Sequence, residues 1–156
     1  MRLFDCACCA PAGFLSAAFS PADGGGVSRP SLKSAGPVAR EVLEELACAS
    51  RILADQGVFD AFGHLSMRHP ASPDRFLMSR SQAPALVTAD DIMEFDLDAE
   101  AVDPQGRSGF FERFIHGEIY KARPDVMAVV HSHSPSVIPF SLVPNKMQAM
   151  YHNAAF

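Results

Sequence analysis

The sequence predicts an α/β fold in which helices and short strands form packed layers. Apolar residues recur at helical spacing in two segments, 38–56 and 111–122. Four other segments have the short alternating or continuous apolar patterns of strands, namely 64–68, 75–79, 92–98 and 126–133. Turns rich in Gly, Pro and Asp separate these segments. Because helices and strands are interleaved along the chain, a mixed, layered α/β domain is expected.

Composition limits the classes of function. The chain has 156 residues, 48% of them hydrophobic and 20% charged, as expected for one globular domain. Its net charge of −5 gives no basic footprint for nucleic acid, and no apolar run is long enough to cross a membrane. Three of the four cysteines lie in the first nine residues, too close together for ordinary disulfides. Free thiols in a reducing cytoplasm are therefore expected.

The first 37 residues are predicted to be a disordered or poorly defined tail. They include a stretch dense in Gly, Pro and Ser, PADGGGVSRPSLKSAGP. The folded domain is then expected to span residues 38–156.

The first predicted helix, 38–56, has an apolar side at spacings of three and four residues, and Gly57 occupies the position of a left-handed C-cap. Leu65 and Met67 alternate with polar residues, as in a half-buried strand. Residues 70–74 form a predicted turn that leads to a partner strand, 75–79. Thr88 is a good N-cap for a short helical turn. A further strand over 92–98 and a loop over 103–109 follow.

The last two predicted elements carry the chemistry. The helix 111–122 ends at an Arg-Pro-Asp turn, which folds it back beside a buried strand, 126–133. His131 and His133 are two residues apart, so on a strand both rings point to one face. Imidazole suits zinc and related divalent ions, so the pair is a candidate metal site. Two surface or hydrogen-bonded histidines would give the same spacing.

The helix before that strand supplies a carboxylate. Glu112 and His116 are four residues apart, on one helical face. A carboxylate near a metal can bind it or act as a general base. Alternatively, Glu112 is a solvated residue paired with Arg113 or His116.

Several motifs together resemble the class II aldolase/adducin family: GHLSMRHP, SRS near residue 80, TADDIMEFDLD and ERFIHGEIYKARPDVMAVVHSHSP. The resemblance implies a three-layer α/β/α sandwich and a homo-oligomer, usually a cyclic tetramer. It implies a divalent metal ion, with zinc favoured and manganese, cobalt or iron as alternatives. By motif position the metal ligands are His131, His133 and Glu112, and Glu112 is also the acid/base.

The family's third histidine ligand lies beyond the HxH strand, in a segment that this chain does not contain. His152 precedes that position and is not assigned the role. The sequence is therefore expected to be a C-terminally truncated version of the domain.

Three motifs concern the substrate. Sugar-phosphate aldolases of the family carry Gly-Asn, a hydroxyl-rich Gly loop and Ser-Ser-Glu as a phosphate cradle. The corresponding residues here are Gly63 with His64, Ser79-Arg80-Ser81, and Phe110-Phe111-Glu112. Gly63, Ser79, Arg80 and Ser81 are predicted to bind substrate, with Arg80 as a fork for a carboxylate. Phe110 and Phe111 either face a flat substrate or belong to the core.

These changes resemble the decarboxylases of aromatic catabolism within the family, which include carboxy-hydroxymuconate semialdehyde and dihydroxyphthalate decarboxylases. The resemblance implies a small hydroxylated, carboxylated aromatic substrate or its ring-cleavage product. His64 or His116 then protonates the carbanion left by carbon dioxide, although His116 also fits a supporting or packing role. An aldolase or epimerase acting on a small hydroxy-carbonyl compound, and a non-catalytic adducin-like assembly domain, are the alternatives.

Overall fold

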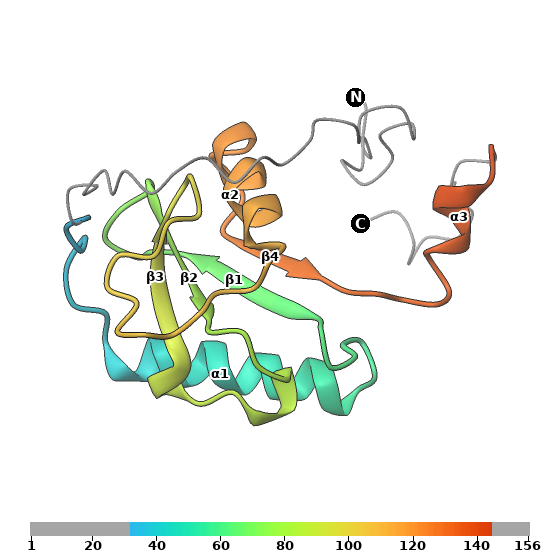
Figure 1. Ribbon diagram of the computed structural model, residues 1–156, viewed down its shortest axis with the longest axis horizontal. Helices are drawn as coiled ribbons and strands as arrows, with labels where there is room; N and C mark the ends of the chain where they lie inside the picture. Colours follow the sequence, from blue (N-terminus) through green and yellow to red (C-terminus); the bar gives the residue numbers. More distant parts are fainter. Residues whose placement is uncertain (1–31, 145–156) are drawn as a thin grey trace, which may run out of the picture. The chain divides into compact units, whose positions relative to one another are not determined.

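The computed structural model describes residues 32–144 and shows an α/β fold built on one antiparallel sheet (Figure 1). No helix among these residues is long and apolar enough to cross a bilayer. The elements follow one another as α1 (Arg40–Asp55), β1 (His64–Arg68), β2 (Arg75–Ser79), η1 (Pro84–Leu86), η2 (Ala89–Asp91), β3 (Ile92–Asp96), α2 (Arg113–Ala122), β4 (Ala128–His131) and α3 (Pro139–Leu142).

The sheet has the strand order β3-β2-β1-β4, and every neighbouring pair is antiparallel. The first three strands form a meander, while β4 reaches the sheet after the long connection that contains α2. Its register places His131 directly opposite His64. His64 is thereby brought beside the pair His131 and His133, although they lie far apart in sequence.

Alternation along the strands divides the sheet into two faces. On one face, Ser66 of β1 and Phe76 of β2 meet α2 through His116 and Tyr120. The hydrophobic core gathers there; its buried members are Phe76, Met78, Met93, Phe95, Ala99, Phe110, Tyr120 and Val129. The core that supports α2 therefore lies on the same face of the sheet as the polar side chains of β1.

The first helix, α1, contacts β1 and both 3-10 turns. It buries Leu46 and Ala47, as the apolar spacing predicted, and also Ser50. The helix is followed by Gly57 with a φ of +69°, which confirms the predicted left-handed residue after its C-terminus. Thr88 and Asp91 form a capping box around η2, so the predicted N-cap is also confirmed.

The guanidinium of Arg68 fastens the end of β1 to the end of α2. Arg68 is 4% exposed and lies over the Tyr120 ring. It donates hydrogen bonds to four backbone carbonyls, those of Pro73, Tyr120, Arg123 and Val126. The fork satisfies carbonyls at the end of the helix and in the turns beside it.

Two predictions about the chemistry-bearing elements were wrong in detail. Helix α2 begins at Arg113 rather than at residue 111, and Glu112 is its N-cap residue. Strand β4 is shorter than predicted and only partly buried, because it is a terminal strand of the sheet within residues 32–144: Val129 lies in the core, whereas Val130 is 49% exposed. The 3-10 turn η1 and the short helix α3 were not predicted.

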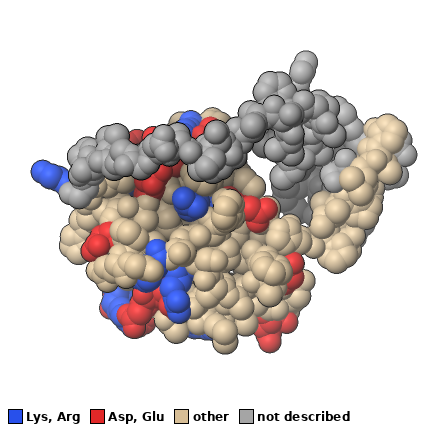
Figure 2. Space-filling model, viewed as in Figure 1, with Lys and Arg blue, Asp and Glu red and all other residues tan. Residues whose placement is uncertain are grey.

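The predicted tail lies mostly outside the described residues, as do His152 and the three N-terminal cysteines. Within its described end, Ser34 and Ala35 donate hydrogen bonds to the Glu94 carboxylate of β3. On the face shown in Figure 2, the basic side chains lie among acidic ones and form no single large patch.

Candidate metal centre

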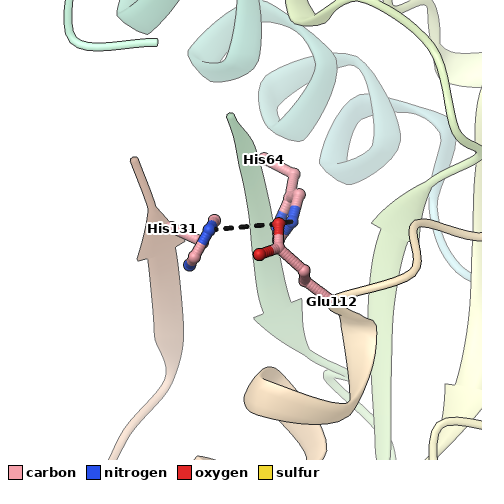
Figure 3. A group of neighbouring side chains, drawn as sticks. All are labelled: His64, Glu112 and His131. Atoms are coloured by element: carbon pink, nitrogen blue, oxygen red, sulfur yellow. Dashed lines mark ion pairs between the residues drawn. The ribbon is translucent and has the colours of Figure 1, made fainter. Parts of the chain in front are cut away.

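Three side chains from different elements meet at one end of the β1–β4 pair (Figure 3). His64 begins β1 and His131 ends β4, and their rings stack with centroids 4.7 Å apart. Glu112 enters from the N-terminus of α2, where its side chain makes no capping hydrogen bond. The carboxylate is therefore free to point at the two imidazoles.

The distances between donor atoms match those around a small divalent ion. Oε2 of Glu112 lies 3.2 Å from Nε2 of His131 and 3.8 Å from Nε2 of His133. The two histidine Nε2 atoms are 3.1 Å apart. A tetrahedral ion with bonds of about 2.0–2.1 Å separates its ligands by roughly 3.3–3.4 Å. Glu112, His131 and His133 thus present one oxygen and two nitrogens at suitable spacing, the set that the sequence predicted.

His64 lies within the same group of potential ligands, because it, Glu112 and His131 can each offer an atom within 4.8 Å of the others. Its Nε2 is 3.6 Å from Oε2 of Glu112, yet it is buried without a hydrogen-bond partner. A buried polar atom without a partner is costly unless a ligand satisfies it. Whether Nε2 carries a proton decides between metal ligation and hydrogen-bond donation to a substrate.

A buried chain of hydrogen bonds lies behind His64. Nδ1 of His64 lies 2.8 Å from Nε2 of His116, and Nδ1 of His116 lies 2.6 Å from the Ser66 hydroxyl. That hydroxyl is 2.8 Å from the hydroxyl of Tyr120. Burial raises the pKa of Tyr120, and its hydrogen bond with Ser66 opposes this rise.

Each hydroxyl and each neutral imidazole in this chain can donate or accept, so two opposite proton orders fit the same distances. In one order, Nε2 of His64 carries a proton and faces Glu112 as a hydrogen-bond donor. In the other order, Nε2 is bare and His64 is a third candidate ligand beside Glu112 and His131.

Both buried imidazoles are neutral near pH 7. Burial, together with the nearby His131, lowers the pKa of His64 to about 4. Burial and the neighbouring His64 lower the pKa of His116 to about 3. Desolvation disfavours the charged form of each ring, so each has one nitrogen that donates and one that accepts.

Asp60 also lies at the site, although the sequence did not predict it there. Its Oδ2 lies 3.0 Å from Nδ1 of His133, and its Oδ1 accepts the backbone N–H groups of Phe62 and Gly63. Asp60 and His133 are 73 residues apart in sequence, so no local pattern connects them.

The residues predicted to bind substrate have different local environments. Gly63 donates to Asp60, and a Cβ there would lie 2.5 Å from the Phe59 ring, so the close packing requires glycine. Ser79 is buried, whereas Ser81 bonds through its backbone to Ser108. Arg80 donates through Nε to Asp91 at 2.6 Å.

The two phenylalanines before Glu112 differ in environment. Phe110 belongs to the core, and its ring lies 4.5 Å from that of His64. Phe111 is 94% exposed. The core interpretation therefore holds for Phe110 alone.

Comparisons with known proteins show which family the chain resembles. The family described as "Class II Aldolase and Adducin N-terminal domain" matches residues 44–156. Decarboxylase tropJ of Talaromyces stipitatus is 42% identical over 107 residues, which make up 67% of this chain and 40% of that protein. The 3,4-dihydroxyphthalate decarboxylase of Arthrobacter keyseri is 37% identical over 109 residues, or 64% of this chain and 43% of the relative.

Among solved structures, L-fuculose 1-phosphate aldolase from Glaciozyma antarctica PI12 superposes with a TM-score of 0.59 at 29% identity. The match covers 72% of this chain and 47% of that aldolase. The chain thus spans less than half the length of each of these relatives. With a family match over residues 44–156 and this agreement in fold, the chain belongs to the class II aldolase and adducin family.

Proposed function

We propose that this chain is a divalent-metal-dependent carbon–carbon lyase, and that it decarboxylates a hydroxylated, carboxylated aromatic compound or its ring-cleavage product. The observation that carries the proposal is the convergence of Glu112 with His131 and His133 at distances of 3.1–3.8 Å. Zinc is the favoured ion for two imidazoles and a carboxylate, and manganese, cobalt or iron would also fit. The bound ion would act as a Lewis acid toward adjacent oxygens of the substrate.

The residues of the chain would act around that ion. His131 and His133 would hold it through Nε2, and the Glu112 carboxylate would bind the ion and act as acid/base in turn. Nε2 of His64 faces the same space. With a proton on Nε2, neutral His64 would bond a substrate oxygen and protonate the carbon from which carbon dioxide has departed, and water would return that proton to Nε2. His116 would orient His64 through Nδ1, with Ser66 and Tyr120 behind it.

Two observations favour decarboxylation over aldol cleavage. The curated relatives tropJ and 3,4-dihydroxyphthalate decarboxylase are both named as decarboxylases. In addition, Phe110 and Phe111 stand where the phosphate-binding branch carries hydroxyl donors, and His64 stands in place of its asparagine. The similarity to L-fuculose 1-phosphate aldolase supports the alternative, an aldolase or epimerase for a small hydroxy-carbonyl compound.

Other features of the family extend the proposal. The complete domain would be a three-layer α/β/α sandwich in a cytoplasmic homo-oligomer, a cyclic tetramer by resemblance. Gly63, Ser79, Arg80 and Ser81 would surround the substrate. Arg80 can offer a carboxylate only its terminal nitrogens, because its Nε is bound to Asp91.

The test combines metal binding with turnover. The purified chain should bind about one equivalent of Zn²⁺ in equilibrium dialysis. It should also release carbon dioxide from at least one member of a panel of dihydroxybenzoates and dihydroxyphthalates. Glu112→Gln should reduce turnover by at least about 100-fold, as expected when a general acid/base is removed. Glu118→Gln changes an exposed carboxylate on the same helix and should leave turnover unchanged.

Binding of less than a tenth of an equivalent of Zn²⁺, Mn²⁺, Co²⁺ or Fe²⁺ would contradict the metal centre. Full turnover in the Glu112→Gln variant would remove Glu112 from the mechanism.

A further inference from the structure

We propose that Asp60 fixes the tautomer and orientation of His133, so that the bare Nε2 of this histidine faces the metal position. The inference deepens the proposed metal centre and rests on it for its functional meaning. The inference predicts the position of one proton on His133, and that position can be determined in the metal-free protein as well. Asp60 is a positioning residue, since it acts through His133 rather than by contacting the metal position itself.

The Asp60 carboxylate is held in a fixed orientation. Its Oδ1 accepts two backbone N–H groups, those of Phe62 and Gly63, each at 2.8 Å. With one oxygen fixed by the turn, the other oxygen is directed at Nδ1 of His133, 3.0 Å away. The same carboxylate therefore connects the turn before His64 with the segment after β4.

The carboxylate determines which ring nitrogen of His133 carries the proton. Oδ2 of Asp60 lies within hydrogen-bond distance of Nδ1 of His133, so one of these two atoms must carry the shared proton. An ionised carboxylate accepts hydrogen bonds and donates none, so Nδ1 of His133 must be the protonated nitrogen. A neutral His133 then has a bare lone pair on Nε2, the form that binds a metal ion.

The remaining neighbours of His133 lie on the other side of its ring. Nε2 is 3.1 Å from Nε2 of His131 and 3.8 Å from Oε2 of Glu112. Among residues 32–144, the hydrogen bond that Nδ1 makes is the one to Asp60. The ring thus has a protonated edge toward Asp60 and a ligating edge toward the candidate metal centre.

Two substitutions separate this role from simple support of the turn. In Asp60→Asn the amide oxygen can still accept from Phe62 and Gly63, but the NH₂ group faces His133 and donates to Nδ1. The proton of His133 is then forced onto Nε2, which blocks metal binding. In Asp60→Ala the turn loses its acceptor, but His133 can adopt either tautomer. A tautomer effect therefore makes Asn the more harmful replacement for metal affinity, whereas a structural role makes Ala the more harmful.

The experiment measures both properties. The ¹⁵N chemical shifts of the imidazoles in metal-free protein at pH 8 should show His133 protonated on Nδ1, and on Nε2 in Asp60→Asn. The Zn²⁺ dissociation constant, from competition with a chromophoric chelator, should rise about 10- to 100-fold in Asp60→Asn. It should rise less in Asp60→Ala. Asp98→Asn alters an exposed carboxylate paired with Lys121 and serves as the matched control with no change.

An unchanged His133 tautomer in Asp60→Asn, or a larger loss of Zn²⁺ affinity in Asp60→Ala, would overturn the inference. The predicted tautomers in a wild-type chain that binds no metal would support the role of Asp60 and refute the metal centre. The two failures are therefore distinguishable.

Discussion

At the scale of single residues, the main feature is the burial of two imidazoles that keep the same protonation state. His64 and His116 are 1% and 0% exposed, and each is paired with a neutral partner. Ser66 and Tyr120 continue the chain of hydrogen bonds behind both rings. A chain of neutral groups can direct one N–H at a substrate without placing a buried charge in the core.

This burial makes the stability of the metal-free protein sensitive to acid. The folded pKa values of about 4 for His64 and about 3 for His116 lie below the unfolded value of 6.5. Below pH 6.5 the unfolded chain binds protons that the folded chain does not, so stability falls. It falls with a slope of about 1.4 kcal/mol per pH unit for each histidine until the folded pKa is reached.

We predict that His116→Gln reduces this slope by about 1.4 kcal/mol per pH unit between pH 6 and pH 5. The measurement is urea unfolding of both proteins in EDTA at several pH values. The comparison uses the slope, so an overall loss of stability in the variant does not affect it. Parallel curves for the two proteins would show that His116 is not kept neutral by the fold.

At the scale of elements, the docking of α2 controls the geometry of the site. The helix presents Glu112 from its N-terminus, and His116 and Tyr120 from its buried side. Gly117 allows this docking, because a Cβ at that position would overlap the backbone carbonyl oxygen of Leu97. A glycine within a short helix lowers its intrinsic stability, so close packing is the physical reason for this one.

We predict that Gly117→Ala destabilises the fold by about 1–3 kcal/mol, despite the higher helix propensity of alanine. The added methyl group must move α2 or the backbone at Leu97, since neither is a flexible side-chain end. Glu118→Ala raises helix propensity at an exposed position of the same helix and is the matched control. Thermal unfolding by circular dichroism tests the pair. A Gly117→Ala protein as stable as the control would show that the space between α2 and the Leu97 backbone accommodates a methyl group.

The sequence predicts these elements unevenly, for physical reasons. The helix over 38–56 and the strand over 75–79 are clear, because one has a sustained apolar side and the other lies between turn residues. The start of α2 was misplaced by two residues, since Phe110 and Phe111 continue the apolar pattern although one is core and the other exposed. Solvent exposure of β4 was missed because its apolar run is the same for a central and a terminal strand.

The candidate site divides in the same way. His131, His133 and Glu112 could be predicted as one site because their spacing and motif are local in sequence. Asp60 and the hydrogen-bond chain through Ser66 and Tyr120 depend on contacts between residues 50 or more positions apart. Such contacts exist only after β1, β4 and α2 have been assembled.

At the scale of the whole molecule, the described part of the chain exposes much apolar surface on the β4 side. β4 has one strand neighbour within residues 32–144, and Met127 and Val130 are 59% and 49% exposed. A terminal strand with exposed apolar side chains has free N–H and C=O groups and favours pairing with another chain. This exposed apolar surface gives a physical reason to expect the proposed homo-oligomer.

We predict that the chain self-associates in a concentration-dependent manner, and that Val130→Lys reduces this association by at least about tenfold in dissociation constant. A lysine on the exposed face of β4 places like charges opposite one another when two such strands pair. Sedimentation velocity over a hundredfold range of concentration gives the mass relative to the 16.8 kDa monomer. Leu86→Lys adds the same charge at a position that is 70% exposed on η1 and serves as the control. If Val130→Lys associates as strongly as wild type, β4 is not the contact; if Leu86→Lys weakens association equally, charge alone explains the effect.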